Sequence, residues 1–273
     1  MLLTDAAATG SHRYRTQDLR LTKPIVFAKY YAERFGQHVR AKGLRSSAAL
    51  LGKNLVWPYY AWLVRRSIQA HEEFDFKYGL ETQTPIPIRN LETSAPGAQY
   101  AIQYEGAAIP LVHRIIRQLR TDLRRFTFID LGSGKGRVLL VAAQYSFNSV
   151  IGVEFSKTLH DIAQSNIYKF VEQGLTKTRP ISINMDAGEF DFSQFGNKVV
   201  FCNNPFAATL TLRVLDKLQF SLRKTGHEGI FIYVTPIPPA VKDKLDTFQL
   251  IAQGSFLSQF GGFQKYFIYR ITG

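Results

Sequence analysis

The stretch Phe126-Thr-Phe-Ile-Asp-Leu-Gly-Ser-Gly-Lys-Gly136 decides the fold of this chain. Its first six residues form an apolar run typical of a buried strand, and a run with helical spacing, 137–145, follows the glycines. Glycines at alternate positions let the backbone turn sharply and lie close to a ligand, since no Cβ intervenes. The spacing is G-x-G-x-G, which differs from both the dinucleotide fingerprint and the phosphate-binding P-loop. The segment therefore predicts a strand, a ligand-binding turn and a helix in direct succession.

Strands and helices continue to alternate on both sides of this segment. Such alternation favours a mostly parallel sheet with helices on both faces. The last two expected strands leave no room for a helix between them, which predicts an antiparallel hairpin at one edge. The fold class is therefore α/β and Rossmann-like, with seven strands of which the last is antiparallel. Helices are expected at 109–123 and 157–173, and the other strands at 149–154, 181–184, 199–202, 229–234, 248–252 and 265–271.

The basic excess of the chain lies mainly near its start. The formal charge is +13, yet residues 1–71 carry 12 basic and 3 acidic side chains, whereas residues 126–273 carry 15 and 11. Such a block can attract nucleic acid, an anionic membrane or an acidic protein, or it can be a solvated helical face. Prolines at 85, 87 and 96 predict an extended connection after it. We expect a basic, mainly helical N-terminal extension and linker over residues 1–98 and a second domain over 99–273.

The composition excludes several other classes of protein. The single cysteine, Cys202, rules out an internal disulfide framework and a cysteine-rich zinc site. The histidines at 113, 160 and 227 have no ligand spacing, so no metal is expected. The apolar run 55–64 is too short to span a bilayer, although its aromatic residues could contact a membrane surface. With no signal-peptide pattern at the start, a cytoplasmic protein is expected.

Polar residues close several of the expected strands. Glu154 ends the second strand, Asp186 and Ala187 follow the third, and Asn203-Asn-Pro-Phe206 follows the fourth. Ligands of open α/β sheets bind outside the carboxyl ends of the strands, so these segments should meet at one crevice. A carboxylate at the end of the second strand can accept hydrogen bonds from both hydroxyls of a ribose.

This combination resembles the class I S-adenosylmethionine (SAM)-dependent methyltransferases, over roughly residues 100–273. The resemblance implies SAM as the cofactor, with Glu154 on its ribose and Asp186 or Ala187 beside its adenine. A segment before the first helix, containing Tyr104 and Glu105, is expected to close over the cofactor. The residues implied near the methionine portion of SAM are Asp130, Gly132, Ser133, Gly134 and Gly136, with Asn203 also at the cofactor.

Two closer likenesses compete within that superfamily. The runs DLGSGKGRVLLVAA and VIGVEFS are similar to the non-SET lysine methyltransferases, both the telomeric-silencing histone type and the mitochondrial ATP synthase type. The histone enzymes carry an Asn-Asn-Phe element that Asn203-Asn-Pro-Phe206 partly matches. The same residues resemble the [Asn/Asp]-Pro-Pro-[Tyr/Phe] motif of amino-methyltransferases, but Asn204 replaces its first proline. A protein lysine is the first expectation, and methylation of nucleic acid or a non-catalytic binding module are the alternatives.

The chemistry of the fourth segment favours an amine acceptor in either case. The amide oxygen of Asn203 and the carbonyl that precedes Pro205 can accept hydrogen bonds from an amino group and orient its lone pair. The ring of Phe206 can hold the apolar part of the acceptor and favour a cationic sulfonium nearby. Asn203, Pro205 and Phe206 are therefore the expected catalytic residues.

Overall fold

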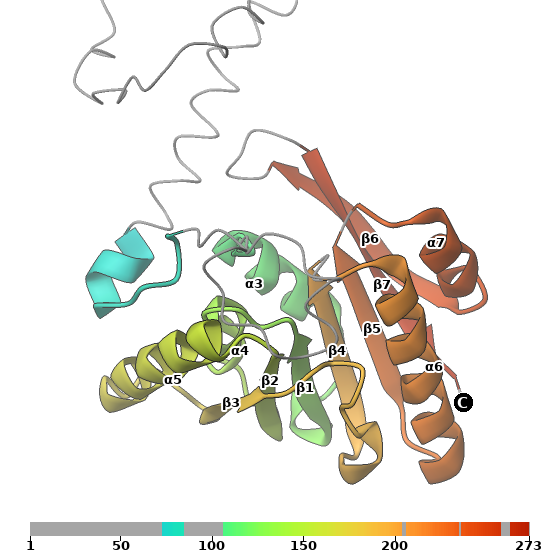
Figure 1. The fold of residues 1–273 in the computed structure, drawn as a ribbon, viewed down its shortest axis with the longest axis horizontal. Helices are drawn as coiled ribbons and strands as arrows, with labels where there is room; N and C mark the ends of the chain where they lie inside the picture. The colour runs from blue at the N-terminus through green and yellow to red at the C-terminus, as the bar shows by residue number, and fades with distance from the viewer. Residues whose placement is uncertain (1–72, 85–105, 204–205, 235, 258–262, 273) are drawn as a thin grey trace, which may run out of the picture. The chain divides into compact units, whose positions relative to one another are not determined.

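The computed structural model describes residues 73–84, 106–203, 206–234, 236–257 and 263–272 (Figure 1). Contacts divide the chain into two units, Met1–Tyr59 and Tyr60–Gly273, and every described residue belongs to the second. Most of the expected N-terminal extension, including the aromatic run at 55–64, lies outside the described residues. Within the described part, no helix has the length and hydropathy needed to cross a membrane.

Seven strands form one sheet in the order β3-β2-β1-β4-β5-β7-β6. β1 to β5 pair in parallel, whereas β7 is antiparallel to both of its neighbours, β5 and β6. The predicted fold class is therefore confirmed, including the hairpin at one edge. The bounds are β1 Phe126–Leu131, β2 Ser149–Glu154, β3 Pro180–Asn184, β4 Asn197–Asn203, β5 Gly229–Val234, β6 Gln249–Leu257 and β7 Phe263–Ile271.

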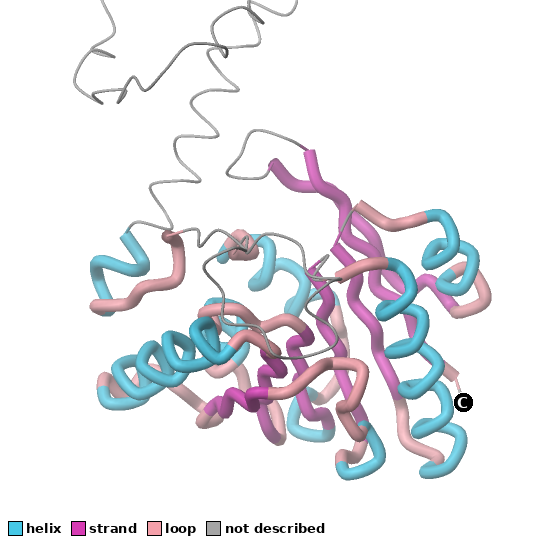
Figure 2. Tube along the Cα trace, viewed as in Figure 1, coloured by secondary structure: helices cyan, strands magenta, loops and turns pink. Residues whose placement is uncertain are grey.

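Helices cover both faces of the sheet, as Figure 2 shows. Buried residues of α3, α4 and α5 pack in one hydrophobic cluster with one face of the strands, and α6 and α7 pack in a second cluster with the other face. β1 and β5 are buried along their whole length because they are covered from both sides. The helices are α3 Ile109–Gln118, α4 Arg137–Ala142, α5 Lys157–Glu172, α6 Ala208–Thr225 and α7 Pro239–Leu245, with short 3-10 turns η3 Leu123–Arg125 and η4 Phe192–Gln194.

The order of the strands reverses beside β1. After β1 the chain moves outward through β2 and β3, and it then returns to place β4 on the other side of β1. Such a switch point leaves a crevice at the carboxyl ends of the strands, where ligands of this class of sheet bind. The glycine turn after β1 and the end of β4 both lie at this place.

Some element boundaries differ from the sequence-based expectation. The helix expected over 109–123 ends at Gln118, because the chain turns at Arg120, whose φ is +47°. The helix expected over 137–145 ends at Ala142. The strand expected over 248–252 extends to Leu257, because it pairs with β7 along its length around an irregularity between Leu250 and Ala252.

Residues 73–84 pack onto the sheet domain. A helical turn, 73–78, places the rings of Phe74 and Tyr78 5.9 and 5.3 Å from the ring of Phe170 on α5. The sequence assigns this segment to the extension, but its described contacts are with the domain that contains the sheet. The boundary expected at residue 98 stays a prediction, since residues 85–105 lie outside the described residues.

Candidate cofactor and acceptor site

Three glycines shape the turn between β1 and α4. Gly132, Gly134 and Gly136 have φ values of +73°, +54° and +83°, in the left-handed region that residues with a Cβ adopt only at a cost. The amides of Gly132 and Ser133 both donate to the carbonyl oxygen of Val153, at 2.9 and 3.1 Å. These bonds hold the turn against the end of β2.

Glu154 joins the glycine turn to the start of α5. Its Oε2 accepts the amide of Gly134 at 2.8 Å, and its Oε1 accepts the amide of Ser156 at 2.9 Å. Burial raises the pKa of this carboxyl to about 7, although the hydrogen bonds from Ser156 and Gly134 act in the opposite direction. Each carboxylate oxygen has a second lone pair, so Glu154 can still accept bonds from two ribose hydroxyls.

A second carboxyl group, Asp130, is buried at the end of β1. Burial raises its pKa well above the ordinary value, and the charge of Glu154 raises it further. Two buried carboxyl groups at one crevice favour a ligand that carries positive charge, because such a ligand stabilises their ionised forms. The sulfonium and ammonium groups of SAM meet this condition.

Ser133 and Gly152 show how closely the turn packs. The Ser133 hydroxyl is buried and has no hydrogen-bond partner among the described residues. A Cβ on Gly152 would lie 2.7 Å from Ser133 Oγ and 2.5 Å from Leu139 Cδ1. A glycine at position 152 is therefore needed for the turn to pack this closely against β2. The Ser133 hydroxyl remains able to form a hydrogen bond with a ligand.

Asp186 and Ala187 lie beyond the end of β3. Oδ1 of Asp186 accepts the amide of Gly188 at 2.8 Å, so this side chain stabilises the turn that it begins. Ala187 is buried in the same hydrophobic cluster as Phe206 and Leu210. The structure thus brings the segments after β3 and β4 together, and the contact of Asp186 or Ala187 with adenine stays a prediction.

Asn203 is the last residue of β4 and is half-buried beside β5, where it pairs in register with Val234. Phe206 is buried, so in this structure its ring contacts the protein core. The expected contacts of both residues with an acceptor stay predictions. Pro205, Tyr104 and Glu105 lie outside the described residues.

Two buried cations beside the turn were missed by the sequence analysis. The side chain of Lys135 is fully buried, and Arg137 is almost so. A signal was available, because Arg137 begins an otherwise apolar run, Val-Leu-Leu-Val-Ala, and a charged residue next to a buried turn needs a partner. Partners come from residues 81–82, and Nη1 of Arg137 also donates to the carbonyl oxygens of Gly106 and Ala107 at 3.5 Å. Local patterns could not identify these partners.

Two of the three described histidines, His113 and His160, have structural partners. His113 hydrogen-bonds the hydroxyl of Tyr145 at 2.8 Å, and His160 lies 2.8 Å from the hydroxyl of Ser182. Across the described ranges, no three His, Cys, Asp or Glu side chains are grouped as a metal site would require. Cys202 is buried in a strand, where it packs as a small apolar residue.

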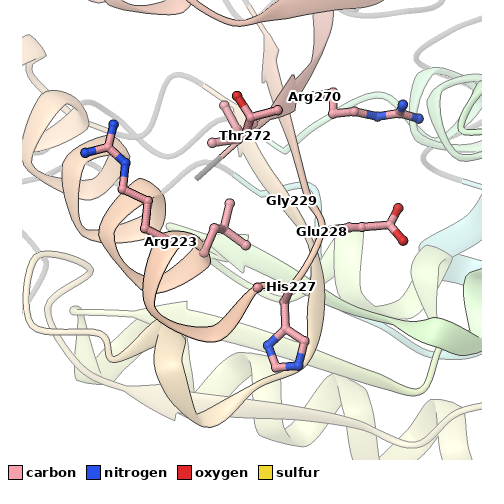
Figure 3. Close-up of a pocket in the computed structure, with 9 residues that line it drawn as sticks. Arg223, His227, Glu228, Gly229, Arg270 and Thr272 are labelled. Carbon is pink, nitrogen blue, oxygen red and sulfur yellow. The ribbon is translucent and has the colours of Figure 1, made fainter.

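An open pocket of about 410 Å³ lies away from this crevice (Figure 3). It is bounded by the end of α6, the start of β5 and the end of β7, so it lies at the amino ends of the parallel strands. In Figure 3 the side chains of Arg223 and Arg270 point away from each other. The pocket is separate from the site that Glu154 and Asn203 define.

The fold and a family match over residues 101–226 together give the class: this chain is a SAM-dependent methyltransferase, and its cofactor is SAM. Residues 101–226 match the family model described as "Histone methylation protein DOT1". That range contains the glycine turn, Glu154 and the segment after β4. The chain is thus similar to this family of methyltransferases over the part that carries the site.

Solved structures with related folds were also found, at low identity. A putative RNA methyltransferase from Pyrococcus horikoshii is 19% identical, with a TM-score of 0.47, over 68% of this chain and 93% of its own. Magnesium protoporphyrin IX methyltransferase from Synechocystis PCC 6803, solved with bound SAM, is 14% identical, with a TM-score of 0.43, over 60% and 77%. These identities and TM-scores do not bear on the substrate of this chain. A search of the curated proteins found no match.

Proposed function

We propose that this enzyme transfers the methyl group of SAM to an amine, and that the acceptor is a protein lysine. The observation that carries the proposal is the position of Asn203, at the carboxyl end of β4 and beside the switch point, within the range that matches the DOT1 model. The description of that family names histone methylation, which supports a protein acceptor.

The residues at the crevice have separate tasks in this proposal. The glycine turn and Asp130 would hold the methionine portion of SAM, and Glu154 would accept the ribose hydroxyls. Asn203 would accept a hydrogen bond from the amino group, which directs the nitrogen lone pair toward the methyl carbon. SAM supplies an activated methyl group on a sulfonium, a good leaving group.

The enzyme needs little acid–base chemistry if the amine arrives without its proton. A lysine that enters this site loses solvation, and desolvation lowers the pKa of its ammonium. A neutral amine can then attack, so the work of the protein is to position the amine and exclude water. Half-burial of Asn203 at a strand end suits this task because the strand restricts its backbone.

Transfer of a radiolabelled methyl group from SAM into a cell lysate tests the proposal. We expect label that protease removes and nuclease does not, with methyl-lysine after acid hydrolysis. Asn203→Ala is the matched variant, and it should bind SAM with nearly unchanged affinity while incorporation falls by about 100-fold. Full incorporation by this variant would remove Asn203 from the acceptor site.

A nucleic acid is the second candidate acceptor. Two observations favour it: the excess of basic residues in 1–71, and the partial likeness of Asn203-Asn-Pro-Phe206 to the motif of amino-methyltransferases. In that case the label would be sensitive to nuclease, and binding of the acceptor would weaken steeply as salt increases. The same lysate experiment therefore separates the two candidates.

A further inference from the structure

The segment 73–84 contacts the glycine turn directly, although more than fifty residues separate them along the chain. The first contact is an ion pair in which Nζ of Lys135 lies 2.6 Å from Oε1 of Glu81. The side chain of Lys135 is fully buried, whereas that of Glu81 is about half exposed. Lys135 stands between Gly134 and Gly136, so this pair acts on the middle of the turn.

The second contact is made by Arg137, the first residue of α4. Its Nε donates to Oγ1 of Thr82 at 2.8 Å, and that hydroxyl donates to Oδ1 of Asp75 at 2.6 Å. The other oxygen of Asp75 accepts the amides of Thr82 and Gln83, at 2.7 and 2.9 Å. Asp75 therefore folds the segment into a shape that presents Thr82 to the helix.

The third contact passes through Asn166, a buried residue of α5. Its Nδ2 donates to the carbonyl oxygens of Lys135 and Glu81, at 3.0 and 3.1 Å. Its Oδ1 accepts the amide of Glu81 at 2.9 Å. One side chain thus fixes the backbone of the turn relative to the backbone of residue 81.

These contacts matter because the turn has little conformational preference of its own. Glycines at 134 and 136 restrict the backbone weakly, so tertiary contacts must select one conformation. Lys135 and Arg137 are buried cations, and burying a charge is unfavourable unless a partner holds it. Without the segment, Lys135 would lose its carboxylate partner, and Lys135 directly follows Gly134, whose amide Glu154 accepts.

We propose that residues 73–84 form a strap that holds the glycine turn in the conformation that binds SAM. Glu81 and Thr82 are its positioning residues, and they act through Lys135 and Arg137. The strap increases the affinity of the enzyme for SAM, and this effect does not depend on which acceptor is methylated. A failure of the lysine proposal would therefore leave this inference unchanged.

The test compares SAM binding by three variants with calorimetry, each in the full chain: Glu81→Gln, Lys135→Met and the double variant. We expect Glu81→Gln to raise the Kd for SAM by about tenfold, since a charge-assisted bond to a buried group is lost. The double variant should bind SAM about as weakly as Lys135→Met alone, because the two residues act as a pair. Glu81→Asp keeps the charge and should recover part of the affinity.

Glu228→Gln is the matched control. It removes another exposed ion pair, between Glu228 and Arg125 at 2.8 Å, which lies at the amino end of β5 and away from the crevice. An equal Kd for SAM in Glu81→Gln and Glu228→Gln would overturn the proposal, and so would additive effects in the double variant. If Glu81→Gln does not fold, hydrogen exchange of the wild-type protein decides: SAM should increase protection of the amide of Glu81, and no increase would overturn the strap.

Discussion

At the residue scale, Glu154 combines two demands that oppose each other. Its carboxylate must be buried to accept amides from the glycine turn and from Ser156, yet burial raises its pKa to about 7. The cofactor-free enzyme therefore holds a carboxyl group that is partly protonated near neutral pH. A ligand with hydroxyl donors and positive charge favours the ionised form.

This pKa predicts how stability depends on pH. Because burial raises the pKa of Glu154 from 4.5 to about 7, the folded state favours the neutral carboxyl group. This contribution to the free energy of unfolding is present in full below pH 4.5 and is lost as the pH rises through 7. The free energy of unfolding of the cofactor-free wild type should thus fall relative to that of Glu154→Gln, by up to about 3 kcal/mol. Urea unfolding of both proteins from pH 4 to 8 measures this. If the free energy of unfolding changed with pH by the same amount in both proteins, the raised pKa of Glu154 would be contradicted.

Gly152 supports a second prediction at this scale. Gly152→Ala places a methyl group 2.5 Å from Leu139 Cδ1 and 2.7 Å from Ser133 Oγ, so the turn must shift. We expect a loss of about 2 kcal/mol of stability and weaker SAM binding. Gly196→Ala is the control, because a Cβ there meets no atom within 4 Å. Thermal unfolding and calorimetric titration of SAM compare the two variants. Equal stability and equal Kd for SAM would show that the turn can accept a methyl group at position 152.

At the scale of elements, the sequence predicted the half of the site that local patterns encode. An apolar run, a glycine turn and a helical run placed β1, the turn and the start of α4 correctly, and Glu154 lies at the end of β2 as expected. The strap was not predicted, because its contacts with Lys135 and Arg137 join residues more than fifty positions apart. Nothing in the local pattern around Glu81 distinguishes a partner for a buried lysine from an ordinary exposed carboxylate.

The end of α3 was also placed wrongly, for a backbone reason. The apolar spacing continues to residue 123, but the chain leaves the helix at Arg120 in a left-handed conformation. Arg120→Gly should therefore raise the free energy of unfolding by about 1 kcal/mol, since glycine adopts this conformation without strain. Arg117→Gly, within the helix, should lower it by about 1 kcal/mol. Urea unfolding tests both changes, and destabilisation by Arg120→Gly would refute the argument.

At the scale of the whole molecule, charge and chemistry lie in different parts of the chain. The excess of basic residues is in 1–71, whereas the residues of the candidate SAM site lie between Asp130 and Phe206 and the range that matches the family model is 101–226. We therefore expect the basic block to bear on recruitment of an acceptor or a surface. It is not required for the chemistry that Glu154 and Asn203 perform in this account.

A deletion of residues 1–71 separates these roles. The shortened chain keeps the strap and the sheet domain, so its Kd for SAM should stay within about twofold of the wild-type value. Its association with a polyanion such as heparin should weaken, because nine net positive charges are lost. Equal retention of both proteins on a heparin column would show that the block is a solvated or packing face.

The most direct test of the account is calorimetric titration of SAM into the wild-type enzyme and into Glu154→Ala. The account predicts binding of one SAM per chain by the wild type, and an affinity lower by about 100-fold in the variant, because two acceptor bonds to the ribose are lost. Absence of SAM binding by the folded wild type, or equal affinity in both proteins, would contradict the site described here.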